Sequence, residues 1–120
     1  MKKNKFLIVE KKGPAFWIRL NRPEVKNAFN LEMAAEVLEA VRLGMKDKAT
    51  SVIVLTGAGD SFSSGGDIQG MKATKLPKVF FLKISKIMNQ AVLEMKRGEK
   101  PVIAAVPGYV GGIADRKSVV

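Results

Sequence analysis

The residues best suited to chemistry form a glycine-rich segment, Ser63-Ser64-Gly65-Gly66-Asp67. Gly65 and Gly66 lack a Cβ atom, so a ligand can approach their backbone N–H groups closely. Asp67 is a good N-cap for a following helical turn, and the positive end of that turn favours an acceptor oxygen. The segment therefore predicts a site that holds an oxygen atom through backbone donors. The alternative is that the glycines only turn the chain, because short glycine motifs also occur by chance.

Few other kinds of catalysis are open to this chain. None of its 120 residues is Cys or His, which excludes thiolate nucleophiles, disulfides and Cys or His metal ligands, and removes the commonest general base. Chemistry must come from carboxylates, hydroxyls, lysines or backbone amides, and we expect no metal site. Glu32, Glu36 and Glu39 are interpreted as the solvated face of a helix rather than as catalytic acids.

The formal charge of +10 allows a nucleic-acid partner, a phosphate-bearing ligand or a solvated basic surface. The lysines are scattered and lack interleaved aromatic residues for base stacking, so we expect no nucleic-acid partner. No apolar run is long enough to cross a bilayer, and the N-terminus does not read as a secretory signal. We expect a cytoplasmic protein of one domain, without a membrane partner.

A hairpin and a helix are predicted before the glycine-rich segment. Phe6 to Val9 and Ala15 to Leu20 alternate as strands around a Gly-Pro turn, and the second strand is expected at an edge or with one buried face. Asn30 caps a predicted helix from about Leu31 to Met45. The predicted apolar stripe of this helix comprises Leu31, Ala34, Ala35, Leu38, Val41 and Met45.

The continuous apolar run Val52 to Leu55 predicts a strand buried on both faces, directly before the glycine-rich segment. A second helix is predicted from about Pro77 to Arg97, with Gly98 just past its end. Its wide apolar stripe should bury most of the helix against a sheet or a neighbouring subunit. The stripe comprises Phe80, Ile84, Ile87, Ala91 and Met95, with Phe81, Met88 and Val92 beside it.

A second buried strand is predicted from Val102 to Val106, followed by another glycine-rich segment from Pro107 to Gly112. Strands separated by helices pair most easily in parallel, so their carboxyl ends meet at one sheet edge. We therefore expect the two glycine-rich segments to face one site.

Three stretches resemble successive segments of the enoyl-CoA hydratase/isomerase, or crotonase, family: LNRPEVKNAFN (Leu20 to Asn30), VIVLTGAGDSFSSGGDIQGM (Val52 to Met71) and KPVIAAVPGYVGG (Lys100 to Gly112). The resemblance implies an α/β fold, a truncated crotonase-like ββα spiral with mainly parallel buried strands and two long helices. It also implies binding of acyl-CoA thioesters, with two backbone N–H groups stabilising an enolate at the thioester oxygen. Coenzyme A belongs to the substrate, and no separate cofactor is expected.

The resemblance also assigns site residues. Gly66 takes the position of the first backbone donor, and Ile113, where the family usually has Gly or Ala, that of the second. The substrate-binding residues implied are Lys26, Ala28, Gly65, Asp67, Ile68, Gln69 and Gly112. Lys26 is the expected partner of a CoA phosphate, with a solvated surface lysine as the alternative. For Asp67 the alternative is a purely structural helix cap.

The resemblance ends at Gly112, so we divide the chain into residues 1–112, the N-terminal part of a crotonase-like domain, and a non-matching tail, residues 113–120. The family's catalytic carboxylates and trimerisation region would follow, and neither Asp60 nor Glu94 takes their place. We expect the acyl-CoA-binding part of a hydratase or isomerase (a homo-oligomer, trimer or hexamer, when intact) that is incomplete and inactive alone. The alternative is a non-catalytic truncated paralogue or interaction subunit.

Overall fold

A hairpin begins the fold, as the alternation of apolar residues predicts. The computed structural model describes residues 4–63, 65, 75–106 and 109–110. Strand β1 (Leu7–Lys12) pairs antiparallel with β2 (Ala15–Leu20). Every second residue of β2 is buried, starting from Phe16, so the predicted one-sided burial is confirmed. The strand is not at an edge, because it lies between β1 and β3.

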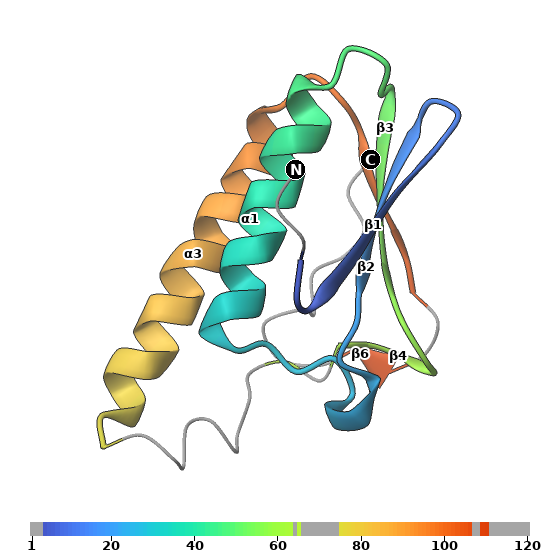
Figure 1. Ribbon diagram of the computed structural model, residues 1–120. Helices are drawn as coiled ribbons and strands as arrows, with labels where there is room; N and C mark the ends of the chain where they lie inside the picture. Colours follow the sequence, from blue (N-terminus) through green and yellow to red (C-terminus); the bar gives the residue numbers. More distant parts are fainter. Residues whose placement is uncertain (1–3, 64, 66–74, 107–108, 111–120) are drawn as a thin grey trace.

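The main sheet has four strands in the order β1-β2-β3-β5. Strand β3 (Val52–Gly57) pairs in parallel with β2 on one side and with β5 (Val102–Ala105) on the other. The predicted parallel arrangement is therefore confirmed. A second pair of short parallel strands, β4 (Ser61–Ser63) and β6 (Tyr109–Val110), lies beyond the ends of β3 and β5 (Figure 1). This pairing has no counterpart among the sequence predictions.

Two long helices lie on one side of the main sheet (Figure 1). Helix α1 (Leu31–Lys46) begins where predicted, since the Asn30 side chain accepts a hydrogen bond from the Met33 N–H at 2.8 Å. Helix α3 (Pro77–Arg97) has the predicted bounds. Helix α1 packs against β1, β2 and β3, whereas α3 packs against α1. The described chain therefore has three layers: the main sheet, α1 packed on the sheet, and α3 packed on α1.

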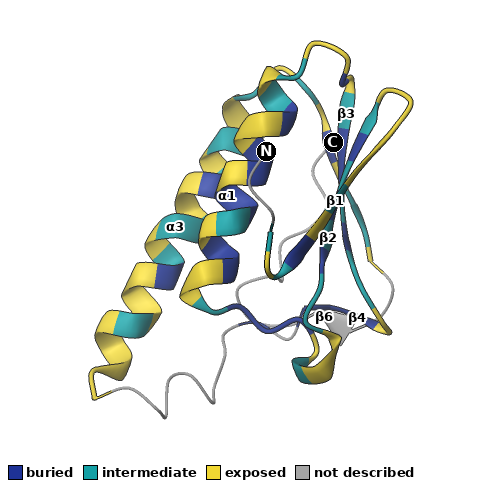
Figure 2. Cartoon of the chain, viewed as in Figure 1, coloured by how far each residue is buried: buried dark blue, intermediate teal, exposed yellow. Residues whose placement is uncertain are grey.

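The buried side of α1 differs from the predicted stripe. Ala34, Leu38 and Val41 are buried as expected, but Leu31 and Ala35 are exposed. Buried and exposed positions alternate along α1 (Figure 2). The helix contacts both the sheet and α3, so its buried surface is wider than one stripe and is rotated from it. The additional buried residues are Met33, Val37, Ala40 and Gly44.

Helix α3 does not bury its apolar stripe against the sheet, and the predicted alternative, burial against a neighbouring subunit, stays a prediction. Its fully buried residues are Ile84 and Ala91, because the helix touches α1 along one side and does not lie on the sheet. Leu82 is 64% exposed and Phe81 is 42% exposed. Part of the apolar surface of α3 therefore faces outward within the described chain.

The two parallel strands predicted to be buried behave differently. In β3, Ile53 and Val54 point to opposite faces and both are buried, as predicted. In β5 only the first residue is buried, and Ile103 is 39% exposed. Strand β5 is the last strand of the described sheet, so its prediction as a second interior strand is wrong for this structure.

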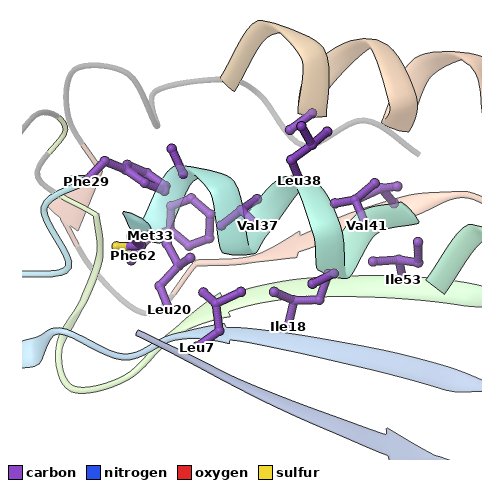
Figure 3. Packing of buried hydrophobic residues seen from close by; sticks show 14 of the residues in the cluster. Leu7, Ile18, Leu20, Phe29, Met33, Val37, Leu38, Val41, Ile53 and Phe62 are labelled. Carbon is purple, nitrogen blue, oxygen red and sulfur yellow. The ribbon is translucent and has the colours of Figure 1, made fainter. Parts of the chain in front are cut away.

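The core lies between the main sheet and α1 (Figure 3). Phe29, Met33 and Phe62 gather at one end of it with Leu20, next to the start of α1. Two of them flank the candidate site in the sequence, since Phe29 ends the loop after β2 and Phe62 directly precedes the glycine-rich segment. No helix in the described ranges is both long enough and apolar enough to span a membrane.

Candidate functional site

The loop that follows β2 is joined to the loop that follows β3 by a buried asparagine. After the short helix η1 (Pro23–Val25), Lys26 and Asn27 both adopt left-handed backbone angles, with φ of 53° and 56°. The Asn27 side chain is fully buried. Its Oδ1 accepts from the Arg22 N–H at 2.7 Å, and its Nδ2 donates to the carbonyl oxygens of Ala58 and Ser61 at 3.0 and 2.9 Å.

A buried serine extends this network to the glycine-rich segment. The Ser63 hydroxyl donates to the carbonyl oxygen of Asn27 at 2.7 Å and accepts from the Gly65 N–H at 3.1 Å. The carbonyl oxygen of Gly65 accepts from the Phe29 N–H at 2.6 Å. Gly65 has a φ of 102°, a conformation that favours glycine. The N–H group of Gly65 is therefore bonded to Ser63, and its carbonyl group is bonded to Phe29.

The same loop carries the two residues predicted to lie near a CoA group. Lys26 is exposed, and within the described part of the chain its ammonium group forms no ion pair. Ala28 is buried, and its carbonyl oxygen accepts from Arg22 Nη1 at 2.6 Å. Since Phe29 bonds to Gly65, the structure brings Lys26, Ala28 and Gly65 into one hydrogen-bonded unit.

One residue of each glycine-rich segment pairs with a residue of the other. Ser63 of β4 is the partner of Val110 in β6. The predicted donors, Gly66 and Ile113, each follow one of these paired residues by three positions in the sequence. The two residues that precede the predicted donors by three positions are therefore neighbours in the sheet of β4 and β6.

Most of the predicted contact residues lie outside the described residues. They are Gly66, Asp67, Ile68, Gln69, Gly112 and Ile113. The helix-cap prediction for Asp67 lies outside as well. Their assigned roles remain predictions.

The described carboxylates do not form a catalytic pair. Glu94 lies beside Arg42, with its Oε1 3.3 Å from Arg42 Nε, and Asp60 accepts a long hydrogen bond from the Ser61 hydroxyl at 3.4 Å. Among the described residues, no cluster of carboxylates could hold a metal ion. The described site therefore consists mainly of backbone groups and of the polar side chains that bind them.

Sequence reasoning missed Asn27 and Ser63. Each of them also has a partner more than thirty positions away, and no local pattern encodes such a bond. One weak signal was available for Asn27, because Asn is enriched among non-glycine residues with positive φ and here it closes a turn that contains Pro23.

Comparison with known proteins gives consistent matches. A sequence profile described as enoyl-CoA hydratase/isomerase matches residues 10–113. A trans-2-decenoyl-[acyl-carrier-protein] isomerase of Streptococcus mutans is 35% identical over 99 residues, which are 81% of this chain and 38% of that protein. A probable mitochondrial enoyl-CoA hydratase of Dictyostelium discoideum is 35% identical over 107 residues, 86% of this chain and 36% of that protein.

The fold comparison agrees. The crystal structure of an enoyl-CoA hydratase/isomerase from Xanthobacter autotrophicus Py2 matches with a TM-score of 0.78 and 30% identity. The match covers 88% of this chain and 40% of that one. The chain thus spans well under half the length of each of these relatives.

Proposed function

Because the chain belongs to the enoyl-CoA hydratase/isomerase family, we propose that it forms the acyl-CoA-binding part of an enzyme of this class. The predicted family resemblance and the crotonase-like α/β fold class are confirmed by the comparisons. Within this proposal, two backbone N–H groups hold the thioester oxygen of the substrate. The observation that carries it is the hydrogen-bonded fixation of Gly65, directly before the first donor.

The proposed donors are the N–H groups of Gly66 and Ile113. When water adds to the double bond of an enoyl thioester, or when that bond migrates, negative charge develops on the thioester oxygen. Preorganised N–H groups stabilise that charge, and loss of one such donor typically costs about 3 kcal/mol of transition-state stabilisation. The pairing of Ser63 with Val110 supports this assignment, because both donor segments start from that pair.

The proposed binding of the carrier group involves the loop after β2. The exposed ammonium group of Lys26 suits a CoA phosphate, and the backbone that follows it is bonded to Ser63 at Asn27 and to Gly65 at Phe29. In this proposal Ala28 and Gly65 also contact the substrate, and the thioester is flanked by Asp67, Ile68, Gln69 and Gly112. No cofactor beyond the thioester substrate is required.

Titration calorimetry of the purified chain with crotonyl-CoA tests the proposal. Gly66→Pro removes the donor N–H, whereas the control Gly66→Ala keeps it. We expect Gly66→Pro to bind about tenfold more weakly than Gly66→Ala, the value of one hydrogen bond. Circular dichroism establishes that all three chains are folded. Equal affinity of Gly66→Pro and the wild type would contradict the donor assignment.

The carrier of the acyl group is tested in the same experiment. The Streptococcus mutans relative is named for an acyl-carrier-protein substrate, so a decenoyl group is offered both on CoA and on an acyl carrier protein. We propose CoA as the carrier and expect saturable binding of decenoyl-CoA that weakens in Lys26→Met. Binding of the protein-linked substrate alone would exclude CoA as the carrier.

A second candidate function is an interaction subunit, which the outward apolar side chains of α3 favour. On the helix, Leu82 is 64% and Val79 42% exposed, and Leu76, directly before the helix, is 63% exposed. Sedimentation equilibrium of the wild type and of Leu82→Lys tests whether these residues mediate association, as a homo-oligomer would require. A wild-type chain that stays monomeric, alone and with an intact family member, would exclude this candidate.

A further inference from the structure

We infer that Ser63 and Asn27 are positioning residues, which aim the peptide unit that supplies the proposed oxyanion donor. The inference rests on the proposed function and adds to it two side chains that do not touch the substrate. The Gly65 carbonyl group and the Gly66 N–H belong to the same peptide unit. That unit is planar, so a bond that fixes the carbonyl also restricts the direction of the N–H.

The described contacts hold Gly65 on both sides of its Cα atom. The Gly65 carbonyl oxygen, which belongs to this peptide unit, accepts from the Phe29 N–H at 2.6 Å. The Gly65 N–H, which belongs to the preceding peptide unit, donates to the Ser63 hydroxyl at 3.1 Å. Gly65 has a φ of 102°, which glycine adopts without steric penalty, so the two bonds select this conformation among the several open to glycine.

The hydroxyl group of Ser63 is suited to this task because it donates and accepts at the same time. It donates to the Asn27 carbonyl oxygen at 2.7 Å while it accepts from Gly65. Ser63 is fully buried. Its removal would therefore leave two buried backbone groups unpaired, and Gly65 would move to find another partner.

Asn27 holds the other end of this connection. Its left-handed backbone, with φ of 56°, presents its carbonyl oxygen to Ser63, and its side-chain amide is fixed by Ala58 and Ser61. Lys26 precedes it directly. The proposed phosphate contact and the proposed oxyanion donor are therefore parts of one frame. Ser63 links them, whereas the bonds of the Asn27 side chain to Arg22, Ala58 and Ser61 do not involve Ser63.

The experiment compares a ligand that needs the oxyanion donor with one that does not. Acetoacetyl-CoA forms an enolate that absorbs in the near ultraviolet, and a donor at the thioester oxygen favours that enolate. Free CoA has no thioester. In Ser63→Ala we expect about a tenfold loss of affinity for acetoacetyl-CoA together with a weakened enolate band, the effect of one misplaced hydrogen bond, and unchanged affinity for CoA.

Ser61→Ala is the matched control. Ser61 is also buried in β4, but its hydroxyl contacts Asp60 at 3.4 Å rather than Gly65. The substitution removes the same atom and should leave both affinities and the enolate band unchanged. Ser63→Cys, which keeps the volume but weakens both hydrogen bonds, provides a second variant if Ser63→Ala fails to fold, with a loss in the same direction expected.

The outcomes separate the inference from the function on which it rests. If the wild type binds acetoacetyl-CoA no better than CoA and forms no enolate, the proposed function fails, and the positioning role fails with it. If the wild type prefers acetoacetyl-CoA and the Ser63 variants keep that preference, only the positioning role is overturned. Equal losses in Ser63→Ala and Ser61→Ala would assign the effect to packing and overturn it as well.

Discussion

The Nδ2 atom of Asn27 lies 2.9 Å from the carbonyl oxygen of Ser61, and this buried bond joins residues 34 positions apart. The same nitrogen also donates to the Ala58 carbonyl oxygen at 3.0 Å. Two acceptors thus converge on one amide group inside the protein. The shape of both loops around the candidate site depends on that group being a donor.

Replacing this donor by an acceptor should destabilise the fold. Asn27→Asp keeps the shape of the side chain but turns a carboxylate oxygen toward two carbonyl oxygens in a fully buried position. We expect a loss of about 2–4 kcal/mol in the free energy of unfolding, measured with urea. Asn89→Asp, an exposed change on α3, adds the same charge and should alter stability little. A similar small effect of both changes would contradict the role of Asn27.

Gly57 should tolerate no side chain, for a steric reason. A Cβ atom there would lie 2.7 Å from the Phe62 carbonyl oxygen and closer still to that of Ser61, both backbone atoms. We expect Gly57→Ala to cost about 2–3 kcal/mol. Gly13→Ala separates the causes, since that site is open but has a φ of +56°. Its cost, from backbone conformation alone, should be about 1 kcal/mol, and equal costs in denaturant titrations would exclude the steric explanation.

The stability of the chain should fall in acid partly through Asp47. A hydrogen bond from Lys11, at 2.7 Å, and then one from the Thr50 hydroxyl lower the pKa of Asp47 from 3.8 to about 2. Because the pKa is lower in the folded state, the carboxylate stabilises the fold above its unfolded pKa, and this contribution disappears as the pH falls through the folded value. The stability difference between the wild type and Asp47→Asn should therefore be constant above about pH 5 and shrink toward about pH 2. Urea midpoints across this range measure it, and a difference that persists at the acid end would refute the assignment.

Lys100 should stabilise the end of α1. Its Nζ atom donates to the carbonyl oxygen of Gly44 at 2.8 Å and to that of Asp47, where the helix leaves acceptors without helical partners. Lys100→Met keeps the apolar stem and removes the charge, and we expect a loss of about 1.5 kcal/mol. Lys96→Met, at an exposed position of α3, is the control. Thermal unfolding of the two variants gives the comparison, and a loss no larger than that of the control would count against the cap.

The features predictable from the sequence were those set by local signals. Asn30 marks the start of α1, Pro77 and Gly98 mark the limits of α3, and the alternation after Ala15 gives the buried face of β2. Each depends on residues within a few positions of one another. The family resemblance rests on longer motifs, and the comparisons confirm it.

Burial depended on partners that one stretch of sequence does not reveal. Leu31 and Ala35 belong to the predicted apolar stripe but are exposed. The side of α1 that contacts the sheet and α3 is rotated away from that stripe. Val102 is buried while Ile103 is not, because β5 closes the described sheet on one side. The pairing of β4 with β6 joins segments of two or three residues, too short for any periodic pattern.

The candidate site was predicted in part. The sequence pointed to the glycine-rich segment, in which Gly65 has positive φ and is bonded at both polar groups. That the segment holds an oxygen atom of a ligand stays a prediction. The side chains that hold it, Asn27 and Ser63, were missed because their function arises only when distant loops meet. The roles of Gly66 and Ile113 stay predictions.

The bonds from Asn27 to Ser61 and from Ser63 to Asn27 enclose 34 and 36 positions of chain, including α1 and β3. Contacts between such distant positions close late in folding, since the entropy of a long loop must first be overcome by the packing inside it. A chain that has formed its helices but not docked β3 would have native-like helicity and no binding site. The proposed thioester binding therefore requires these long-range contacts to be closed, so in this chain it would report completed folding and not helix content.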